Sequence, residues 1–273
     1  MTVHKEASGK RSVSIEVELP GTAEQIWQAI ATGPGITSWF VPAEIEERTG
    51  GGVTFHVLPE FTTSGVVTAW EPPGRFAYEE RDWMPGAPPL ATECFIETRD
   101  GGTCVLRLVH SLFASGDDWD DQLESFLGGW PPAFRVLRLY LRHFAGRAAA
   151  SSRVMIQVSL PGEEAFHTLL ARAGLTGAKV GERCGTRGSG VPALEGLVEL
   201  AQDEHPPREL IVRVDRPAPG IAAFGIHEWG GDVRALLSFY WFGADAETWA
   251  KKQDELWSEW LHRQLPASEE TGA

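Results

Sequence analysis

The stretch Val13-Ser-Ile-Glu-Val-Glu-Leu-Pro-Gly21 recurs later in the chain as Val154-Met-Ile-Gln-Val-Ser-Leu-Pro-Gly162. Apolar residues alternate along both copies, which predicts a β-strand that buries one of its faces. Each strand runs into an amphipathic stretch, residues 24–31 in the first copy and 163–173 in the second, which predicts a short helix. The order and spacing of these elements indicate a tandem duplication of one fold.

The remainder of each copy supports the duplication. The first copy contains several strand-like runs, near residues 43–48, 51–58, 64–71, 75–82, 91–99 and 103–113. Each copy closes with a long helical pattern, residues 131–144 and 246–265. An antiparallel sheet of this length has to bury one face, and only the final helix is long enough to cover it. The predicted fold class is α+β, with two tandem domains that each wrap a curved antiparallel sheet around a long C-terminal helix.

The boundary between the copies is expected in residues 147–152, which gives a first domain of residues 1–147 and a second of 153–273. The second copy keeps the skeleton, but residues 176–192 are rich in glycine where strands are expected. We expect it to be a degenerate copy that carries structure more than chemistry.

Composition narrows the classes of function. The 24 basic and 38 acidic residues give a formal net charge of -14, and such a chain repels phosphate. Nucleic acid is therefore not expected as a partner, and no window is apolar enough for membrane insertion. The polar N-terminus favours a cytoplasmic protein, and the absence of Asn with 19 Arg against 5 Lys suggests a bacterial source. The three cysteines lack the spacing of a disulfide framework or a zinc site, and no nucleotide, hydrolase or metalloprotease motif is present. No cofactor and no metal are expected.

A glycine pair suggests the register of one hairpin. If Gly101-Gly102 forms a two-residue turn, Glu93 faces His110 and Phe95 faces Leu108 on the cavity side of the sheet. A carboxylate beside an imidazole could act as an acid–base pair or orient the polar end of a ligand. The alternative is a cross-strand polar pair at the wetter end of the sheet, with no role in function.

The first copy is rich in bulky apolar side chains, which could line a ligand pocket or simply form the core. The candidate ligand-binding residues are Trp39, Phe40, Phe55, Phe61, Tyr78, Trp83, Phe95, Leu108, His110, Trp130, Phe134 and Leu137. The acidic run at 117–121 lacks the ligand pattern of a calcium loop, so we interpret it as the solvated start of a helix.

Several short motifs fall in the order of a known family. They are Ile26-Trp27-Gln-Ala-Ile30, Ile36-Thr-Ser-Trp39-Phe40, Gly50-Gly-Gly52, Gly65-Val-Val-Thr-Ala-Trp-Glu-Pro-Pro73, Gly101-Gly-Thr103, His110-Ser111 and Gly129-Trp130. In these motifs, residues 13–146 resemble the heat-shock protein 90 ATPase activator homologue-like family of the START-like helix-grip, or SRPBCC, superfamily. The resemblance implies a cavity between the sheet and the long helix, which relatives use for hydrophobic small molecules.

Three functions remain open from the sequence. The first is non-catalytic binding of a hydrophobic small molecule or lipid in the first domain. The second, implied by relatives, is a polyketide cyclase or aromatase, in which His110, Glu93 and Tyr78 would be the catalytic residues. The third, suggested by the family name, is a regulator of a chaperone ATPase or another stress-related partner protein, because fold alone does not choose between functions.

Overall fold

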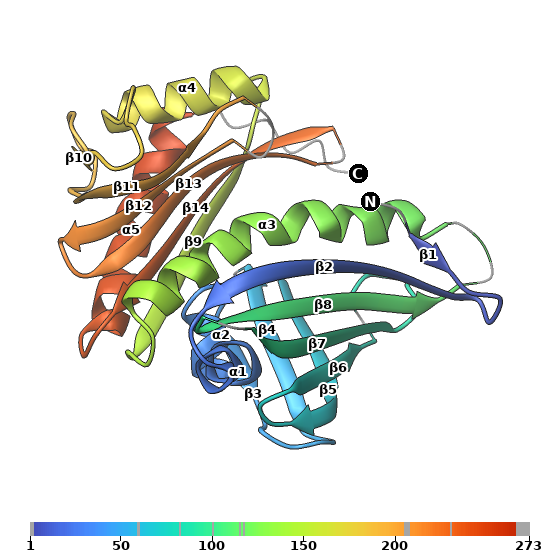
Figure 1. Ribbon diagram of the computed structural model, residues 1–273. Helices are drawn as coiled ribbons and strands as arrows, with labels where there is room; N and C mark the ends of the chain where they lie inside the picture. Colours follow the sequence, from blue (N-terminus) through green and yellow to red (C-terminus); the bar gives the residue numbers. More distant parts are fainter. Residues whose placement is uncertain are drawn as a thin grey trace. The chain divides into compact units, whose positions relative to one another are not determined.

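The structure is a computed structural model that describes residues 3–58, 61–81, 83–99, 101–114, 116, 118–204, 208–229 and 231–265. The chain divides into two compact units, Met1–Arg147 and Ala148–Ala273. Each unit is an antiparallel sheet with a long helix at the C-terminal end of its sequence (Figure 1). The predicted α+β class and the two tandem helix-grip domains are confirmed.

The first unit, which we call the first domain, contains eight strands and three helices among its described residues. In chain order they are β1 (His4–Lys5), β2 (Lys10–Pro20), α1 (Ala23–Ala31), α2 (Gly33–Thr37), β3 (Ala43–Ile45), β4 (Gly52–Leu58), β5 (Phe61–Glu71), β6 (Arg75–Glu80), β7 (Leu90–Arg99), β8 (Thr103–Phe113) and α3 (Asp120–His143). The strand order in the sheet is β1-β2-β8-β7-β6-β5-β4-β3. The helix α3 runs along this sheet (Figure 1).

The helix α1 begins with a capping box. Thr22 caps the helix by accepting a hydrogen bond from the amide of Gln25, and the Gln25 side chain accepts one from the amide of Thr22. This reciprocal arrangement satisfies two amide donors that a helix N-terminus leaves without partners. Ile26, Trp27 and Ile30 point into the core from the opposite face.

The helix α3 begins eleven residues earlier than the apolar pattern indicated. Its first turn carries Asp120 and Asp121, and it continues through Pro131 and Pro132 to His143. The acidic start and the later apolar pattern were predicted as separate features, because two prolines inside a helix remove two amide donors. They belong to one helix, and the prolines mark a place where its backbone hydrogen bonding is weakened.

The register of the β7–β8 hairpin differs from the predicted one by one residue. Arg99 pairs with Thr103, so one residue more lies between the paired positions than a two-residue turn allows. In consequence His110 pairs with Thr92, and Glu93 pairs with Val109 on the other face of the sheet. A slip of one residue moves every side chain of a strand to the opposite face, so the predicted Glu93–His110 pair is wrong.

The second unit, which we call the second domain, has six strands and two helices among its described residues. They are β9 (Ala149–Val158), α4 (Gly162–Ala173), β10 (Arg183–Gly185), β11 (Glu195–Gln202), β12 (Arg208–Arg216), β13 (Gly220–Trp229), β14 (Asp232–Phe242) and α5 (Ala246–Gln264). The order β10-β11-β12-β13-β14-β9 repeats the central six positions of the first sheet. Residues 149–152, expected between the domains, form the first part of β9.

The glycine-rich stretch of the second domain contains little regular structure. Of residues 176–192, only Arg183–Gly185 form a strand. The core of this domain is nevertheless large, and it includes Trp241, Trp257 and Trp260, which are almost fully buried. Dense aromatic packing against α5 therefore stabilises this domain, although its sheet is shorter at the glycine-rich edge.

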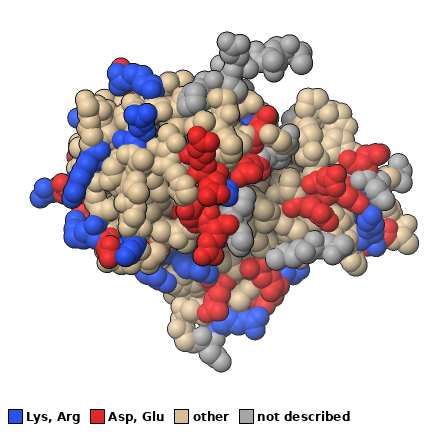
Figure 2. All heavy atoms as spheres, turned by 90° about the horizontal axis from the view of Figure 1, so that it is seen from above, with Lys and Arg blue, Asp and Glu red and all other residues tan. Residues whose placement is uncertain are grey.

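The surface carries both signs of charge, with acidic side chains in several groups on the face drawn in Figure 2. No helix in the described part of the chain is both long enough and apolar enough to cross a membrane.

Candidate functional site

The β7–β8 pairing and α3 bring three polar side chains together inside the first domain. Thr92 and His110 are partners across the two strands, and the Thr92 hydroxyl lies 2.9 Å from Nδ1 of His110. From α3, Nε1 of Trp130 lies 2.7 Å from Nε2 of His110. Thr92 is fully buried, and His110 is 4% exposed.

The direction of each hydrogen bond follows from the chemistry of the groups. The indole N–H of Trp130 can only donate, so Nε2 of His110 must accept and carries no proton. In the neutral ring the proton is then on Nδ1, which donates to the oxygen of Thr92. Both ring nitrogens of His110 are therefore occupied, one as donor and one as acceptor.

Tyr78 extends this chain of hydrogen bonds to the next strand. It pairs with Thr92 across β6 and β7, and a hydrogen bond from the Thr92 hydroxyl to the phenol oxygen stabilises the phenolate form. Burial has the larger opposite effect, and with the nearby charge of Glu80 it raises the pKa of Tyr78 well above its usual range. We call Tyr78, Thr92, His110 and Trp130 the polar chain.

The surroundings of His110 keep its ring neutral. Burial lowers the pKa of His110 to about 3, because the imidazolium would lose its hydration in this interior. The ring of Phe126 lies 4.6 Å from that of His110, and the ring of Trp130 stacks on it at 5.7 Å. The polar chain is thus embedded among aromatic groups that cannot stabilise a charge through hydrogen bonds.

The aromatic rings around Trp130 fill the adjacent part of the interior. Trp130 stacks on Phe40 at 5.1 Å and on Phe134 at 5.4 Å, so its indole lies between two phenyl rings. Trp39, two residues after the end of α2, contacts the same group and donates its own indole N–H to the carbonyl of Ala29. Four of the predicted ligand-binding residues, Trp39, Phe40, Trp130 and Phe134, therefore form one cluster next to His110.

Other predicted residues are buried nearby, Phe55 and Leu108 on the sheet, Trp83 in the loop after β6 and Leu137 on α3. Phe55 contacts Tyr78, with ring centres 5.2 Å apart, and Trp83 contacts Phe126 at 5.7 Å. Leu108 and Leu137 are buried. These residues continue the apolar lining on both sides of the polar chain.

Three predicted residues lie elsewhere. Phe61 is 44% exposed at the start of β5. Phe95 pairs with Arg107 on the outer face of the sheet, where the Arg107 guanidinium lies 4.4 Å from the ring centre. Glu93 points to the same outer face and forms an ion pair with Arg75, so the structure does not join these three residues to the polar chain.

Sequence reasoning missed Thr92, Phe126 and Glu80. A threonine inside an apolar strand is not a distinctive signal, and Phe126 precedes the predicted start of the final helix. Glu80 is 7% exposed on the inner face of β6, and burial raises its pKa, while a hydrogen bond with Thr63 acts in the opposite direction. Glu79 and Glu80 are adjacent in one strand, so they point to opposite faces of the sheet. The sequence does not show which of the two is buried until the register is known.

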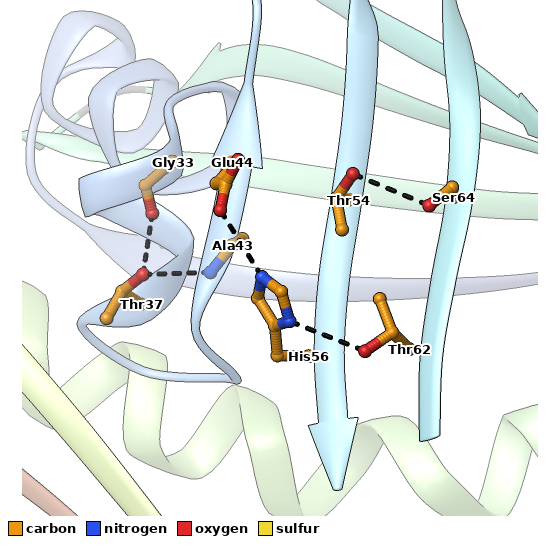
Figure 3. A network of polar contacts seen from close by, with 8 residues as sticks. All are labelled: Gly33, Thr37, Ala43, Glu44, Thr54, His56, Thr62 and Ser64. Carbon is orange, nitrogen blue, oxygen red and sulfur yellow. Dashed lines mark hydrogen bonds and ion pairs between the residues drawn. The ribbon is translucent and has the colours of Figure 1, made fainter. Parts of the chain in front are cut away.

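A separate polar network lies on the outer surface of β3, β4 and β5 (Figure 3). His56 lies 3.5 Å from Glu44 and 3.4 Å from Thr62, and Thr37 accepts a hydrogen bond from the amide of Ala43. The side chains of Glu44 and His56 are 81% and 43% exposed. Water competes for the contacts of Glu44 and His56, which join neighbouring strands, while the hydrogen bond of Thr37 ties α2 to β3.

The acidic run at the start of α3 is partly used in ion pairs. Asp120 accepts from Arg11 at 2.7 Å and from Lys5 at 2.6 Å, which ties α3 to β1 and β2. Asp117, the first residue of the run, lies outside the described residues. Within the described part of the chain, no group of three or more His, Cys, Asp or Glu side chains is arranged to hold a metal ion.

The second domain repeats this arrangement without its polar groups. On its sheet Phe239 pairs with Ala222, and Trp257 from α5 stacks on Phe239 at 5.2 Å. The indole of Trp257 donates to Gln253 on its own helix. The stacked tryptophan is thus common to both domains, but its hydrogen bond to the sheet exists only in the first.

The fold and the aromatic interior define a helix-grip domain built around a buried polar chain. Residues 20–142 match the model of the family described as "Activator of Hsp90 ATPase homolog 1-like protein". This match lies within the first domain, in the region that its motifs indicated.

Comparison with solved structures gives several similar chains. CalU16 from Micromonospora echinospora is 21% identical over 52% of this chain and 83% of its own, with a TM-score of 0.42. The di-domain ARO/CYC protein BexL of the BE-7585A biosynthetic pathway is 14% identical over 93% of both chains, with a TM-score of 0.43. The Aha1 dimer from Colwellia psychrerythraea is 18% identical over 48% of this chain and 96% of its own, with a TM-score of 0.40. A search of curated proteins found no match.

Proposed function

We propose that the first domain binds an apolar, planar small molecule between the inner face of its sheet and α3, without catalysing a reaction on it. The observation that carries this proposal is the polar chain, because it places hydrogen-bonding groups of fixed direction inside an otherwise aromatic interior. Binding sites for small molecules are commonly built from apolar surface and a few such groups.

The protonation states of the site favour binding over proton transfer. A general acid or base works best when its pKa lies near the working pH. Burial instead holds the pKa of His110 at about 3 and raises that of Tyr78, so both groups stay neutral near pH 7. Burial also raises the pKa of Cys94 to about 12, which keeps this inner-face thiol from becoming a nucleophilic thiolate.

The test locates the binding site with the second domain as an internal control. The full chain is incubated with naphthalene, 2-naphthol or palmitate, and hydrogen–deuterium exchange is compared with and without each molecule. We expect slower exchange in β7, β8 and α3 and no change in β13, β14 and α5. Protection confined to the second domain, or no protection by any molecule, would contradict the proposal.

A second candidate function is acid–base catalysis on the same bound molecule. It is favoured by Glu80, whose raised pKa brings it closer to neutral pH and which lies near Tyr78. The probe is 2-tetralone, a bicyclic ketone whose α-protons exchange with deuterium in D2O under acid–base catalysis. An enzyme of this kind accelerates the exchange, and Glu80→Gln abolishes the acceleration while Glu93→Gln on the outer face retains it.

A further inference from the structure

The indole of Trp130 has the features of a bound ligand. It is a flat bicyclic ring between two phenyl rings, 5.1 Å from Phe40 and 5.4 Å from Phe134. Its N–H donates to His110 at 2.7 Å, and this is its hydrogen bond to the sheet. A free molecule with a planar bicyclic ring and one donor would make the same contacts in the same place.

The hydrogen bonds of His110 determine which kind of group can bind to its Nε2 atom. With Nδ1 donating to Thr92, Nε2 can only accept. If Trp130 moves away, a buried acceptor loses its partner, and an unpaired buried acceptor is costly. The replacement must therefore supply an N–H or O–H donor, and a ring that carries only an ether oxygen or no polar atom does not restore the bond.

The helix that holds Trp130 is built so that this residue can leave. Gly128 and Gly129 precede it on an exposed part of α3, and an added Cβ at either position would meet no atom within 4 Å. Packing therefore does not require glycine there, although glycine weakens a helix. Pro131 and Pro132 follow directly and remove two amide donors, which weakens the internal hydrogen bonding of this turn of α3.

The second domain has a tryptophan on its final helix that is held more firmly than Trp130. Trp257 is fully buried, and its N–H is bonded to Gln253 within α5. The helix α5 contains no glycine or proline between Ala246 and Gln264. Its tryptophan faces Phe239, so its removal would expose no unpaired acceptor on the sheet.

We propose that Trp130 occupies the ligand site of the first domain as an internal substitute, and that the ligand is a planar bicyclic or larger aromatic molecule with a hydroxyl or N–H donor that displaces it and bonds to Nε2 of His110. This inference rests on the proposed binding function and adds the class of ligand and the residue it replaces.

The test compares three ring molecules that differ only in the donor. Equilibrium dialysis against the full chain gives the dissociation constants of 2-naphthol, 2-methoxynaphthalene and naphthalene. We expect 2-naphthol to bind about five- to tenfold more tightly than the other two, the usual value of one buried hydrogen bond. Trp130→Phe removes the competing donor from the unliganded protein but keeps a ring, so it should tighten the binding of all three molecules and leave the preference unchanged, whereas His110→Phe should abolish the preference.

Trp257→Phe in the second domain is the matched control and should leave the three affinities unchanged. A second measurement uses the unmodified chain: the indole N–H resonance of Trp130, shifted downfield by its bond to imidazole, should move upfield when 2-naphthol binds and stay in place with 2-methoxynaphthalene. Equal affinities for the three molecules, or an unmoved indole resonance with 2-naphthol bound, would overturn the inference and leave the proposed binding function intact. If none of the three molecules binds, both are wrong.

Discussion

The two domains each place a tryptophan from the final helix against aromatic rings of the sheet and differ in what that tryptophan meets. Trp130 stacks on His110 with ring centres 5.7 Å apart, and Trp257 stacks on Phe239 at 5.2 Å. The second domain shows that the fold needs only the stacked rings. The histidine of the first domain and its bond to Thr92 are therefore additions to the helix-grip core, and such additions point to function.

The hairpins beneath these rings differ as well. In the second domain Trp229 pairs with Asp232, the register of a two-residue turn, whereas in the first Arg99 pairs with Thr103. The extra residue in the first hairpin decides which strand partner His110 receives. With the tighter register His110 would face Glu93, a carboxylate, instead of the neutral hydroxyl of Thr92.

The largest effect is expected from removal of the tryptophan of the second domain. Trp257→Ala leaves a cavity beside Phe224, Phe239 and Trp260, and such a change costs about 3–5 kcal/mol. Trp130→Ala should cost roughly 1–3 kcal/mol, because Trp130 is only partly buried and follows a weak turn of α3. Hydrogen exchange in β13 and β14 measures the first change, and exchange in β7 and β8 measures the second.

Because the chain has two domains, each variant is compared through its own strands and not through one global transition. Equal losses in the two domains would show that Trp130 is as firmly packed as Trp257.

The next effect is a loss of stability in acid that depends on His110. The folded-state pKa of about 3 lies below the ordinary value of 6.5, so the unfolded chain binds this proton first. The contribution is fully present above pH 6.5 and is lost as the pH falls toward 3. Between pH 7 and pH 5 the first domain should lose about 2 kcal/mol through this group.

His110→Phe should remove that loss from β7 and β8. Buried Glu80 acts in the opposite direction, since its pKa is raised, but it is present in both proteins and cancels in the comparison. The second domain keeps its own acid sensitivity through His227, whose pKa burial lowers to about 4, with Arg153 contributing. An unchanged pH profile of β8 exchange in His110→Phe would show that the pKa of this histidine in the folded chain is close to its ordinary value.

The sequence predicted the fold well because the relevant signals are periodic and local. The alternation of residues 13–19 and the Thr22 cap determine β2 and α1, and the internal repeat indicates that the whole arrangement occurs twice. The buried aromatic residues Trp39 and Phe134 were also predictable from their place in the pattern. These features depend on spacing along the chain, which a sequence states directly.

The candidate site was predicted only in part because its polar contacts depend on register. His110 and Tyr78 were named from the sequence, but the partner of His110 changes when the turn at Gly101 contains one residue more. The role of Trp130 required α3 to continue through Pro131 and Pro132, against the usual effect of proline in a helix. Neither the turn length nor that continuation has a strong local signal.

A smaller effect measures how strongly His110 and Trp130 are coupled. In a double-mutant cycle, His110→Phe and Trp130→Phe are made singly and together, and the loss of the hydrogen bond should be shared by both single variants. We expect a coupling free energy of about 1 kcal/mol from exchange in β8. Additive effects would mean that the 2.7 Å contact contributes nothing beyond ring packing.

The smallest effect is expected at Glu93, and it separates the two faces of one strand. Glu93 forms an ion pair with Arg75 at 3.1 Å, its side chain is 24% exposed, and Arg75 also pairs with Glu71. Such a pair contributes about 0–1 kcal/mol and is screened by salt, so Glu93→Gln should change stability by less than about 0.5 kcal/mol.

Thr92→Val, one residue away from Glu93, removes the buried acceptor of His110 Nδ1 and should cost about 1–3 kcal/mol. Exchange in β7 and β8 reports both variants under identical conditions, and naphthol binding should weaken only in Thr92→Val. If Glu93→Gln were the more damaging of the two, His110 would depend on Glu93 after all, and the hairpin would have the tighter register of the second domain.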